Sequence, residues 1–253
     1  MEGPGLVVLK EKAAKFKGKK VLLAYGSQKI DFDRITAQRL NDIKTWGKHL
    51  LLIFEECTVL IHYLMFGQYI LDAKHAEKLP KLALEFKTGE WNNYNCAIRI
   101  LDGTNMDAVY DWSTDVMQDA WDGDQAVQKL MARPEMLVCD ALMDQSIFTG
   151  VGNVIKNETL FRVSMDPRST LGALSPVQLN ALVSEARSYS FDFYRWEVEG
   201  TRRKKYCVHR KARCPDCNNR LTKEFTGQTP RSSFYCSYCQ LLYTEPGANP
   251  TSL

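Results

Sequence analysis

Four cysteines near the C-terminus have the types and spacing of a metal site. Cys214 and Cys217 form one Cys-x-x-Cys knuckle, eighteen residues follow, and Cys236 and Cys239 form a second knuckle. Each knuckle turns two thiolates to the same side of a tight turn, so two of them predict a short hairpin around one tetrahedral Zn²⁺. The metal would supply the core that so small a unit lacks. Two disulfides or four free thiols are the weaker alternatives.

An arginine between the knuckles offers a second kind of chemistry. Arg231 is followed by Ser-Ser-Phe-Tyr and then by Cys236. A guanidinium at the tip of a rigid hairpin presents a fork of donors that suits a phosphate or a base edge. A solvated turn residue is an equal alternative on spacing alone.

Charge is unevenly distributed along the 253 residues, whose formal net charge is only +3. Ten Lys or Arg residues lie between positions 202 and 231 against two acidic ones, and the first twenty residues hold six Lys against two Glu. Two basic clusters on a nearly neutral chain predict a face that binds a polyanion. Solvated lysines are a stronger alternative for the N-terminal cluster than for the second one.

The remaining cysteines and the hydropathy indicate the cellular setting. Four further cysteines lie in apolar surroundings and are predicted to be buried free thiols, as is typical of a reducing compartment: Cys57, Cys96, Cys139 and Cys207. No apolar run reaches membrane-spanning length, and the N-terminus lacks the pattern of a signal peptide. We expect an intracellular protein without a membrane partner.

The periodicity of apolar residues changes along the chain. A helix is expected from about residue 6 to Gly18, followed by strands over 21–25, 43–46, 49–54, 58–65, 82–86, 95–101 and 106–110. From about residue 121 the pattern favours helices over 126–131, 136–143, 155–161 and 175–193, the last with a Ser-Pro start. The tail over 244–253 is expected to be disordered. The fold class is therefore α+β.

A glycine-rich turn lies between two of the predicted helices. Gly150, Gly152 and Asn153 stand in the run Gly-Val-Gly-Asn at the start of the helix predicted over 155–161. Backbone N–H groups and a short amide at a helix start make a phosphate cradle. Glycine-rich interhelix turns are common, so this segment alone is moderate evidence.

Five segments in order resemble the formamidopyrimidine-DNA glycosylase/endonuclease VIII family, and the endonuclease VIII branch in particular. The run from Leu142 through Gly-Val-Gly-Asn153 to Glu158 and Phe161 is similar to the helix–two-turns–helix motif of that family. The cysteine hairpin is similar to its DNA-binding zinc finger. The Glu-Gly-Pro start, Trp-Gly-Lys-His around Lys48, and His-Tyr-Leu-Met-Phe-Gly from residue 62 are the other three segments.

The resemblance implies a reaction and its catalytic residues. In the family an N-terminal α-amine attacks C1′ of a damaged nucleotide, so Met1 would be the nucleophile, Glu2 the proton donor to the sugar ring oxygen, and Lys48 a contact to the backbone beside the lesion. An α-amine has a pKa near 8, which leaves it far more nucleophilic than a lysine at neutral pH. Family members begin with Pro after loss of the initiator, and Met1 stands in that position here.

The resemblance also implies how DNA would be held. Asn153 and Arg231 would clamp the phosphates that flank an everted nucleotide, next to the turn of Gly150 and Gly152. Leu64, Met65 and Phe66 would wedge into the base stack. Taken singly, a strand-surface lysine, a core Leu-Met pair and a helix-start carboxylate are the plainer interpretations of these residues.

The prediction is a monomeric bifunctional glycosylase and abasic-site lyase that excises oxidised bases from duplex DNA and carries one structural zinc. Its parts are a β-sandwich-like catalytic domain with a leading helix (1–120), a helical DNA-binding domain (121–206), a zinc hairpin (207–243) and the tail (244–253). We expect it to be associated with DNA inside the cell, at the nucleoid if the source is bacterial. The alternative is a catalytically weak zinc protein that binds lesions or DNA structures.

Overall fold

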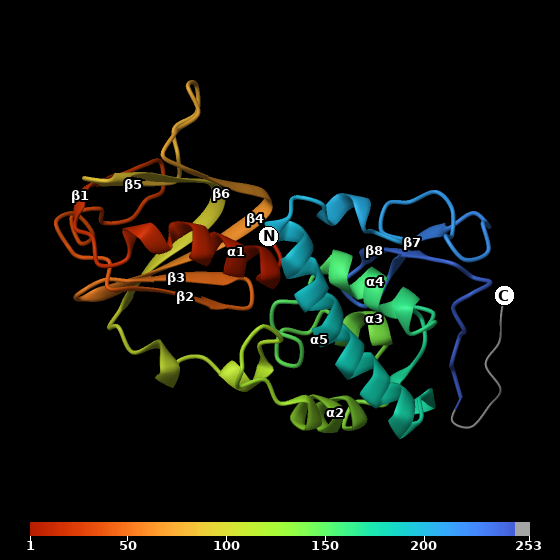
Figure 1. Cartoon of the computed structure of the whole chain (residues 1–253). Helices are drawn as coiled ribbons and strands as arrows, with labels where there is room; N and C mark the ends of the chain where they lie inside the picture. The colour runs from red at the N-terminus through yellow and green to blue at the C-terminus, as the bar shows by residue number, and fades with distance from the viewer. Residues whose placement is uncertain (246–253) are drawn as a thin grey trace. The chain divides into compact units, whose positions relative to one another are not determined.

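The computed structural model of this chain describes residues 1–245 and divides into two compact units (Figure 1). The first unit is Met1–Asp111, and the second begins at Trp112. The predicted disordered tail lies, from residue 246 onward, outside the described residues. The finer division into four parts remains a prediction.

The first unit is a six-stranded antiparallel sheet with a leading helix, α1 (Gly3–Ala13). The strands are ordered β1-β5-β6-β4-β3-β2, so that β1 and β2 are the edges. The sheet curls around α1, with β5 on one side of the helix and β2 and β3 on the other (Figure 1). Their bounds are β1 (Val21–Tyr25), β2 (Asp42–Trp46), β3 (His49–Ile53), β4 (Cys57–Leu71), β5 (Leu82–Phe86) and β6 (Gly89–Asp102).

The core of this unit lies between the helix and the sheet. Leu6 and Leu9 of α1 are fully buried together with Leu52 of β3 and Trp91 of β6. Pro4 stands in the first helical turn, where its missing N–H costs nothing. The predicted leading helix is confirmed, and the strands predicted over 49–54 and 58–65 are found as the paired strands β3 and β4.

One predicted strand is wrong. Residues 106–110 hold a short 3-10 helix, Met106–Ala108, in place of a strand. The Asn105 side chain accepts a hydrogen bond from the Asp107 N–H at 3.2 Å, which caps the turn and offers the backbone an alternative to a sheet ladder.

Strand β4 carries a large bulge opposite β6. Tyr63 pairs with Cys96 and Gln68 pairs with Tyr94, so that β4 has three more residues in this interval than its partner strand. Phe66 takes a left-handed φ of 63°, and its carbonyl accepts a hydrogen bond from the Asn95 side chain at 3.3 Å. Such a bulge re-aims side chains out of the sheet.

The second unit is helical and ends in a two-stranded hairpin. A cluster of buried apolar residues from its helices forms a separate core. Ser175 and Gln178 form a capping box at the start of the longest helix, which confirms the predicted Ser-Pro start. The helix predicted over 136–143 is only one turn long. The bounds are α2 (Gly123–Met131), α3 (Val138–Ala141), α4 (Asn153–Arg162), α5 (Pro176–Val198), β7 (Thr222–Thr226) and β8 (Arg231–Tyr235).

Among residues 1–245, none of the helices combines the length and the apolar character needed to cross a bilayer. Cys57, Cys96 and Cys139 are buried free thiols as predicted, whereas Cys207 is only partly buried.

The bulge gives a test of the sheet. A Cβ on Gly67 would lie 2.7 Å from the Tyr63 Cβ and 2.9 Å from the Asn95 carbonyl oxygen, closer than real Cβ contacts. We expect Gly67→Ala to lower the free energy of unfolding by about 1–3 kcal/mol because the backbone must shift. Chemical denaturation of the full chain measures this cost. Met65→Ala, in the same bulge but 73% exposed, should leave stability nearly unchanged; equal effects of the two would contradict the bulge geometry.

Candidate functional site

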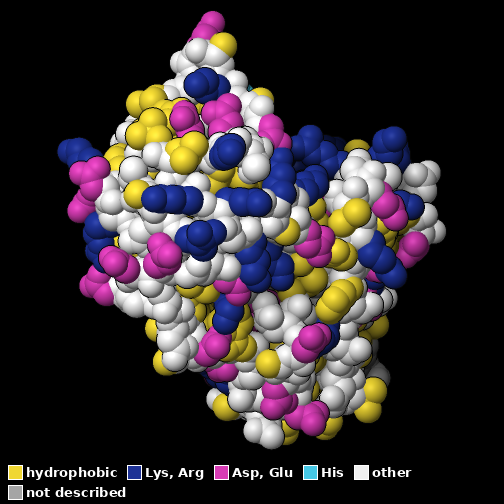
Figure 2. Space-filling view, turned by 60° about the vertical axis from the view of Figure 1, so that its left-hand side comes forward, with side chains coloured by type: hydrophobic (Ala, Val, Ile, Leu, Met, Phe, Trp, Pro, Cys, Tyr) yellow, Lys and Arg dark blue, Asp and Glu magenta, His cyan; other side chains and the backbone are white. Residues whose placement is uncertain are grey.

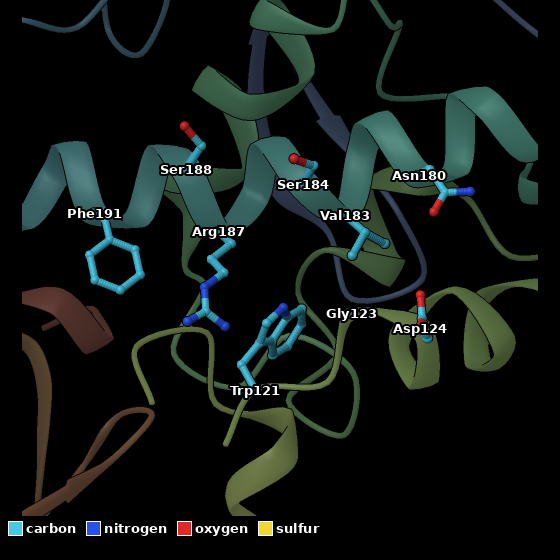
Figure 3. Close-up of a pocket in the computed structure, with 9 residues that line it drawn as sticks. All are labelled: Trp121, Gly123, Asp124, Asn180, Val183, Ser184, Arg187, Ser188 and Phe191. Atoms are coloured by element: carbon cyan, nitrogen blue, oxygen red, sulfur yellow. The ribbon is translucent and has the colours of Figure 1, made fainter. Parts of the chain in front are cut away.

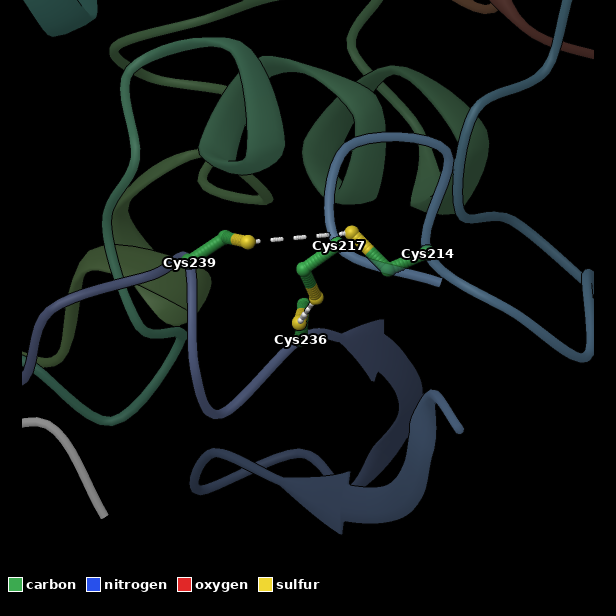
Figure 4. Close-up of side chains that lie close together, drawn as sticks. All are labelled: Cys214, Cys217, Cys236 and Cys239. Carbon is green, nitrogen blue, oxygen red and sulfur yellow. Dashed lines mark hydrogen bonds between the residues drawn. The ribbon is translucent and has the colours of Figure 1, made fainter. Parts of the chain in front are cut away.

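The four predicted metal ligands meet in the second unit. The sulfur atoms of Cys214, Cys217, Cys236 and Cys239 all lie within 4.8 Å of one another. The Sγ atoms are 3.8 Å apart in Cys214 and Cys239 and 3.5 Å apart in Cys217 and Cys236 (Figure 4). A disulfide requires about 2.05 Å, so these are free thiols arranged as a ligand set for a metal ion.

Helix α4 holds the hairpin that these cysteines close. The Asn153 side-chain N–H donates to the Ser232 carbonyl at 2.9 Å. One turn later, the buried Lys156 amine donates to the Ser233 hydroxyl at 2.9 Å. Residues three and four apart lie on one face of a helix, so the start of α4 docks β8 side by side with the predicted phosphate cradle.

Glu158 fixes the segment that leads into the first knuckle. Its carboxylate is fully buried and accepts three backbone N–H groups, from Cys207 at 2.8 Å, Val208 at 3.0 Å and His209 at 2.7 Å. A buried carboxylate is tolerated when it is hydrogen-bonded in this way. The basic run between residues 202 and 213 is therefore anchored at its centre.

The two-turn segment before α4 is held by one amide side chain. Gln145 donates to the carbonyls of Met143 and Val151 at 2.9 and 3.1 Å and accepts from the Gly150 N–H at 3.1 Å. Gly150 has a φ of 99°, a conformation that favours glycine. Gly152 is the N-cap residue of α4 in an extended conformation. The predicted cradle is thus a fixed turn at the start of a helix.

Arg231 begins strand β8 and is exposed, directly beside Ser232, to which Asn153 is bonded. The turn between β7 and β8 is held by Asp140 of α3, whose carboxylate accepts the Gln228 N–H at 3.0 and 3.1 Å. Asn153 of α4 is therefore bonded to the residue after Arg231, and Arg231 itself stands on a hairpin whose tip is fixed.

Two of the predicted catalytic residues open the first unit. The Met1 α-amine donates to the Tyr63 carbonyl at 3.3 Å, and the Met1 side chain packs over Gly5, where a Cβ would lie 3.0 Å from the Met1 Cγ. Glu2 is the N-cap residue of α1. Gly5 thus leaves room for the Met1 side chain at the start of the helix.

Lys48 lies in the two-residue turn between β2 and β3, so the plainer interpretation as a strand-surface lysine is wrong. Gly47, the first residue of this turn, has a φ of 53°, as tight hairpin turns require. His62 lies near both Lys48 and the N-terminus: burial lowers the pKa of His62, and the charges of the Met1 α-amine and of Lys48 lower it further. The Met1 α-amine is thus bonded to the residue after His62, and the ring of His49, the residue after Lys48, lies 5.5 Å from the His62 ring between centroids.

The Lys48 turn is braced by a group of rings. Trp46 and His49 pair directly across the hairpin, and both contact the Tyr110 ring, at centroid distances of 4.8 and 5.8 Å. The Trp46 indole N–H donates to the Asp111 carbonyl at 2.9 Å. Burial, followed by the charges of His62 and Arg99, lowers the pKa of His49 to about 4, so that this ring is neutral at pH 7.

The predicted wedge residues are on the surface. Leu64, Met65 and Phe66 are 50%, 73% and 75% exposed at the bulge of β4. The alternative interpretation of Leu64 and Met65 as core residues is therefore wrong. Contiguous exposed apolar side chains of this size mark a contact surface for another molecule.

The N-terminal lysine cluster is partly neutralised. Lys15 forms an ion pair with Asp72, and Lys17 forms one with Asp42 at 2.7 Å. Figure 2 shows Lys and Arg side chains interspersed with acidic ones across one face of the molecule. These contacts fit the alternative that the N-terminal lysines form a solvated surface.

A hollow of about 460 Å³ lies between the start of α2 and one side of α5. The Arg187 guanidinium extends toward the Trp121 ring, and Phe191 stands at the other end (Figure 3). Arg187 also donates to the Gln118 carbonyl at 3.2 Å. None of the predicted site residues lines this hollow.

Several residues that build the site carry no role in the sequence prediction. Glu158 stands in the helix–two-turns–helix run without an assigned function, and His62, Lys156 and His209 are not distinguished by their spacing. Their partners lie far away in the sequence; those of Glu158, for example, are 49 to 51 residues further along the chain. The one available signal was the presence of polar residues at α4 positions that an amphipathic pattern would leave apolar.

The chain is similar in sequence to DNA glycosylases. Residues 103–189 match the model of the formamidopyrimidine-DNA glycosylase H2TH domain. The chain is 27% identical over 206 residues to endonuclease 8-like 3 of Mus musculus, covering 78% of this chain and 34% of that protein. It is 26% identical over 234 residues to formamidopyrimidine-DNA glycosylase of Vibrio vulnificus, covering 83% and 85%.

A solved structure of a DNA glycosylase has a similar fold. A crystal structure of Lactococcus lactis formamidopyrimidine-DNA glycosylase, bound non-covalently to DNA with an abasic site, superimposes with a TM-score of 0.83 at 18% identity, covering 95% of this chain and 99% of that one. The α+β fold with a leading helix and a four-cysteine cluster is thereby confirmed. The chain spans about a third of the length of the endonuclease 8-like 3 relative.

The buried carboxylate of α4 gives a test of how the site is built. Glu158→Gln replaces one acceptor oxygen with an N–H donor that faces backbone N–H groups, so we expect a loss of about 2–4 kcal/mol in the free energy of unfolding. Glu185→Gln is the matched control, since Glu185 forms a partly exposed ion pair with Arg162 and should cost under about 1 kcal/mol. Chemical denaturation monitored by helical circular dichroism compares the two; a Glu158 variant as stable as the control would show that the three amides do not depend on the carboxylate.

Proposed function

The chain belongs to the formamidopyrimidine-DNA glycosylase/endonuclease VIII family, and on that premise we propose that it is a DNA glycosylase with abasic-site lyase activity that excises oxidised bases from duplex DNA. The observation that carries the proposal is the position of the Met1 α-amine at the start of α1, bonded to the carbonyl of Tyr63 beside His62. An amine that is partly neutral at pH 7 is the nucleophile that this chemistry needs.

The proposed reaction begins at the sugar. The neutral Met1 amine attacks C1′, and the glycosidic bond breaks with its electrons on the departing base. Glu2 takes up the proton that the Met1 nitrogen loses and passes it to the ring oxygen as the sugar opens, which leaves a protonated imine between Met1 and C1′, while the departed base takes a proton from water. Elimination of the 3′-phosphate from this imine gives the lyase step. Lys48 holds the DNA backbone beside the reacting nucleotide.

DNA would be held by residues of both units. Asn153 and Arg231 bind phosphates from the fixed hairpin and the Gly150-Val-Gly152 turn, and Leu64, Met65 and Phe66 fill the space of the everted base. A related glycosylase from Lactococcus lactis has been crystallised with DNA that contains an oxidised pyrimidine. Duplex DNA with oxidised bases or abasic sites is therefore the proposed substrate of this chain.

The proposed metal is one structural Zn²⁺ on the four cysteines. Tetrahedral coordination with Zn–S bonds of about 2.3 Å places the sulfurs about 3.8 Å apart. The sulfur atoms of Cys214 and Cys239 are 3.8 Å apart and those of Cys217 and Cys236 are 3.5 Å apart, so the residues fit this ion. When bound, zinc closes the hairpin that carries Arg231 and has no part in the reaction.

Elemental analysis tests the metal. We expect one Zn²⁺ per chain, and we expect Cys236→Ser to lose both zinc and DNA binding because a ligand is removed. Most of the helical circular dichroism should remain, since the hairpin is small. Cys57→Ser is the matched control, a buried free thiol in the first unit, and should keep the metal. Metal-free protein that binds lesion DNA normally would refute the zinc assignment.

The N-terminal amine decides between the enzyme and a binding protein. Borohydride should trap a covalent adduct with abasic-site DNA, and peptide mapping should place it on Met1 once intact mass has established the terminus. Acetylation of the α-amine should abolish trapping and leave binding intact. An adduct on a lysine, or activity that survives acetylation, would exclude this mechanism; tight binding without any adduct would favour the catalytically weak lesion binder.

The same assay separates Glu2 and Lys48 from the amine. An abasic site has no base to expel, so Glu2→Gln and Lys48→Ala should reduce excision of an oxidised base more than trapping on an abasic site.

A further inference from the structure

A basic hollow of about 390 Å³ lies where the start of α4 meets the segment before the first cysteine knuckle. Four of the seven residues that line it are cationic, and none is acidic: Val154, Arg202, Arg203, Tyr206, His209, Arg210 and Lys211. Arg202 is engaged by Glu197 at 3.0 Å. For the other three cations, no ion pair is found within residues 1–245. Val154 is the residue after Asn153, so this hollow begins beside the proposed phosphate clamp.

The hollow contains one buried polar side chain, His209, which is only 7% exposed. Its orientation is fixed through Asn157. The Phe234 N–H donates to the Asn157 Oδ1 at 3.4 Å, which directs the Asn157 Nδ2 toward the His209 Nδ1 at 3.0 Å. The Nδ1 therefore accepts, and the single ring proton is on Nε2.

The Nε2–H makes no hydrogen bond to any residue that the structure describes, and the ring lines the hollow. Burial, followed by the charges of Arg210, Lys156 and Arg202, lowers the pKa of His209 to about 4. The imidazole is thus neutral at pH 7 and presents a donor in a fixed position. Tyr206 and Phe234 hold the ring from the sides, at 5.6 and 5.1 Å between centroids.

We propose that this hollow binds a phosphodiester group of the DNA strand next to the one held by Asn153, with His209 Nε2–H as the buried donor and Arg203, Arg210 and Lys211 as the neutralising cations. The partial positive charge at the start of α4 adds to the attraction for an anion. Because Glu158 fixes the backbone of His209, the donor needs little reorganisation on binding. The inference rests on the proposed function, since it assigns a contact to the same DNA.

The decisive experiment pairs protein variants with single uncharged phosphates. Duplexes carry an abasic-site analogue and one methylphosphonate at each position around it, and affinity is measured by fluorescence anisotropy. Neutralising the bound phosphate should cost the wild-type chain about tenfold in affinity, in the range of a lost charged hydrogen bond. At that one position the same change should cost His209→Phe and Arg203→Gln/Lys211→Gln much less.

The control is Lys204→Gln/Lys205→Gln, which removes the same charge from exposed neighbours that do not line the hollow. It should weaken binding at all positions alike and show no coupling to any methylphosphonate. For Arg203→Gln/Lys211→Gln, the slope of log affinity against log salt should fall by about one to two. Unchanged zinc content and unfolding midpoint show that the hairpin remains folded in each variant.

Three outcomes would overturn the proposal while the wild-type chain still binds and is trapped by borohydride. Additive effects of protein and phosphate changes at every position would exclude the contact. If Asn153→Ala couples to the same methylphosphonate position as the variants of the hollow, both sets of residues bind one phosphate and not two neighbouring ones. Binding of inorganic phosphate that His209→Phe removes without any change in DNA affinity would make the hollow a site for a free anion. A wild-type chain that binds no duplex refutes the proposed function itself.

Discussion

The second unit depends on the hydrogen bonds that the buried carboxylate of Glu158 accepts. The carboxylate is fully buried, and three consecutive backbone N–H groups donate hydrogen bonds to it. Leaving such a charge without hydrogen bonds costs several kcal/mol. The segment from Cys207 to His209 must therefore keep the conformation that turns its N–H groups toward Glu158. That conformation determines where the basic residues stand and where the first knuckle begins. Strand β8 is held against α4 in the same way, by hydrogen bonds to the side chains of Asn153, Lys156 and Asn157.

The sequence predicts those parts of the site whose information is local. The cysteine spacing predicts the cluster, and Gly-Val-Gly-Asn predicts a helix start, because each is decided within a few residues. The wedge residues follow from the family resemblance, but their exposure depends on three extra residues of β4 relative to β6, which no local pattern reveals. Residues 106–110 alternate like a strand, yet the Asn105 side chain caps a 3-10 turn there. The three backbone N–H groups that Glu158 binds lie far from it in the sequence, so the periodicity of apolar residues does not reveal them.

In the proposed function the two units have different chemical roles. The first unit holds an amine whose proton must leave near neutral pH, together with two histidines whose pKa is lowered by burial and by nearby positive charge. The second unit holds cations and neutral donors on a hairpin fixed by buried polar contacts. Each unit has its own apolar core. A change in one core should therefore affect its own part of the activity first, binding or chemistry, before it affects the other.

The contacts between α4 and the hairpin also bear on the order of folding. Asn153 and its partner Ser232 are 79 residues apart, and the Glu158 contacts span about fifty. Pairings of such sequence separation form late, because the entropy of closing long loops must be overcome first. During synthesis the polar face of α4 emerges well before the strand that covers it. The buried polar side chains of α4 therefore lack their partners until residues 207–235 have been synthesised.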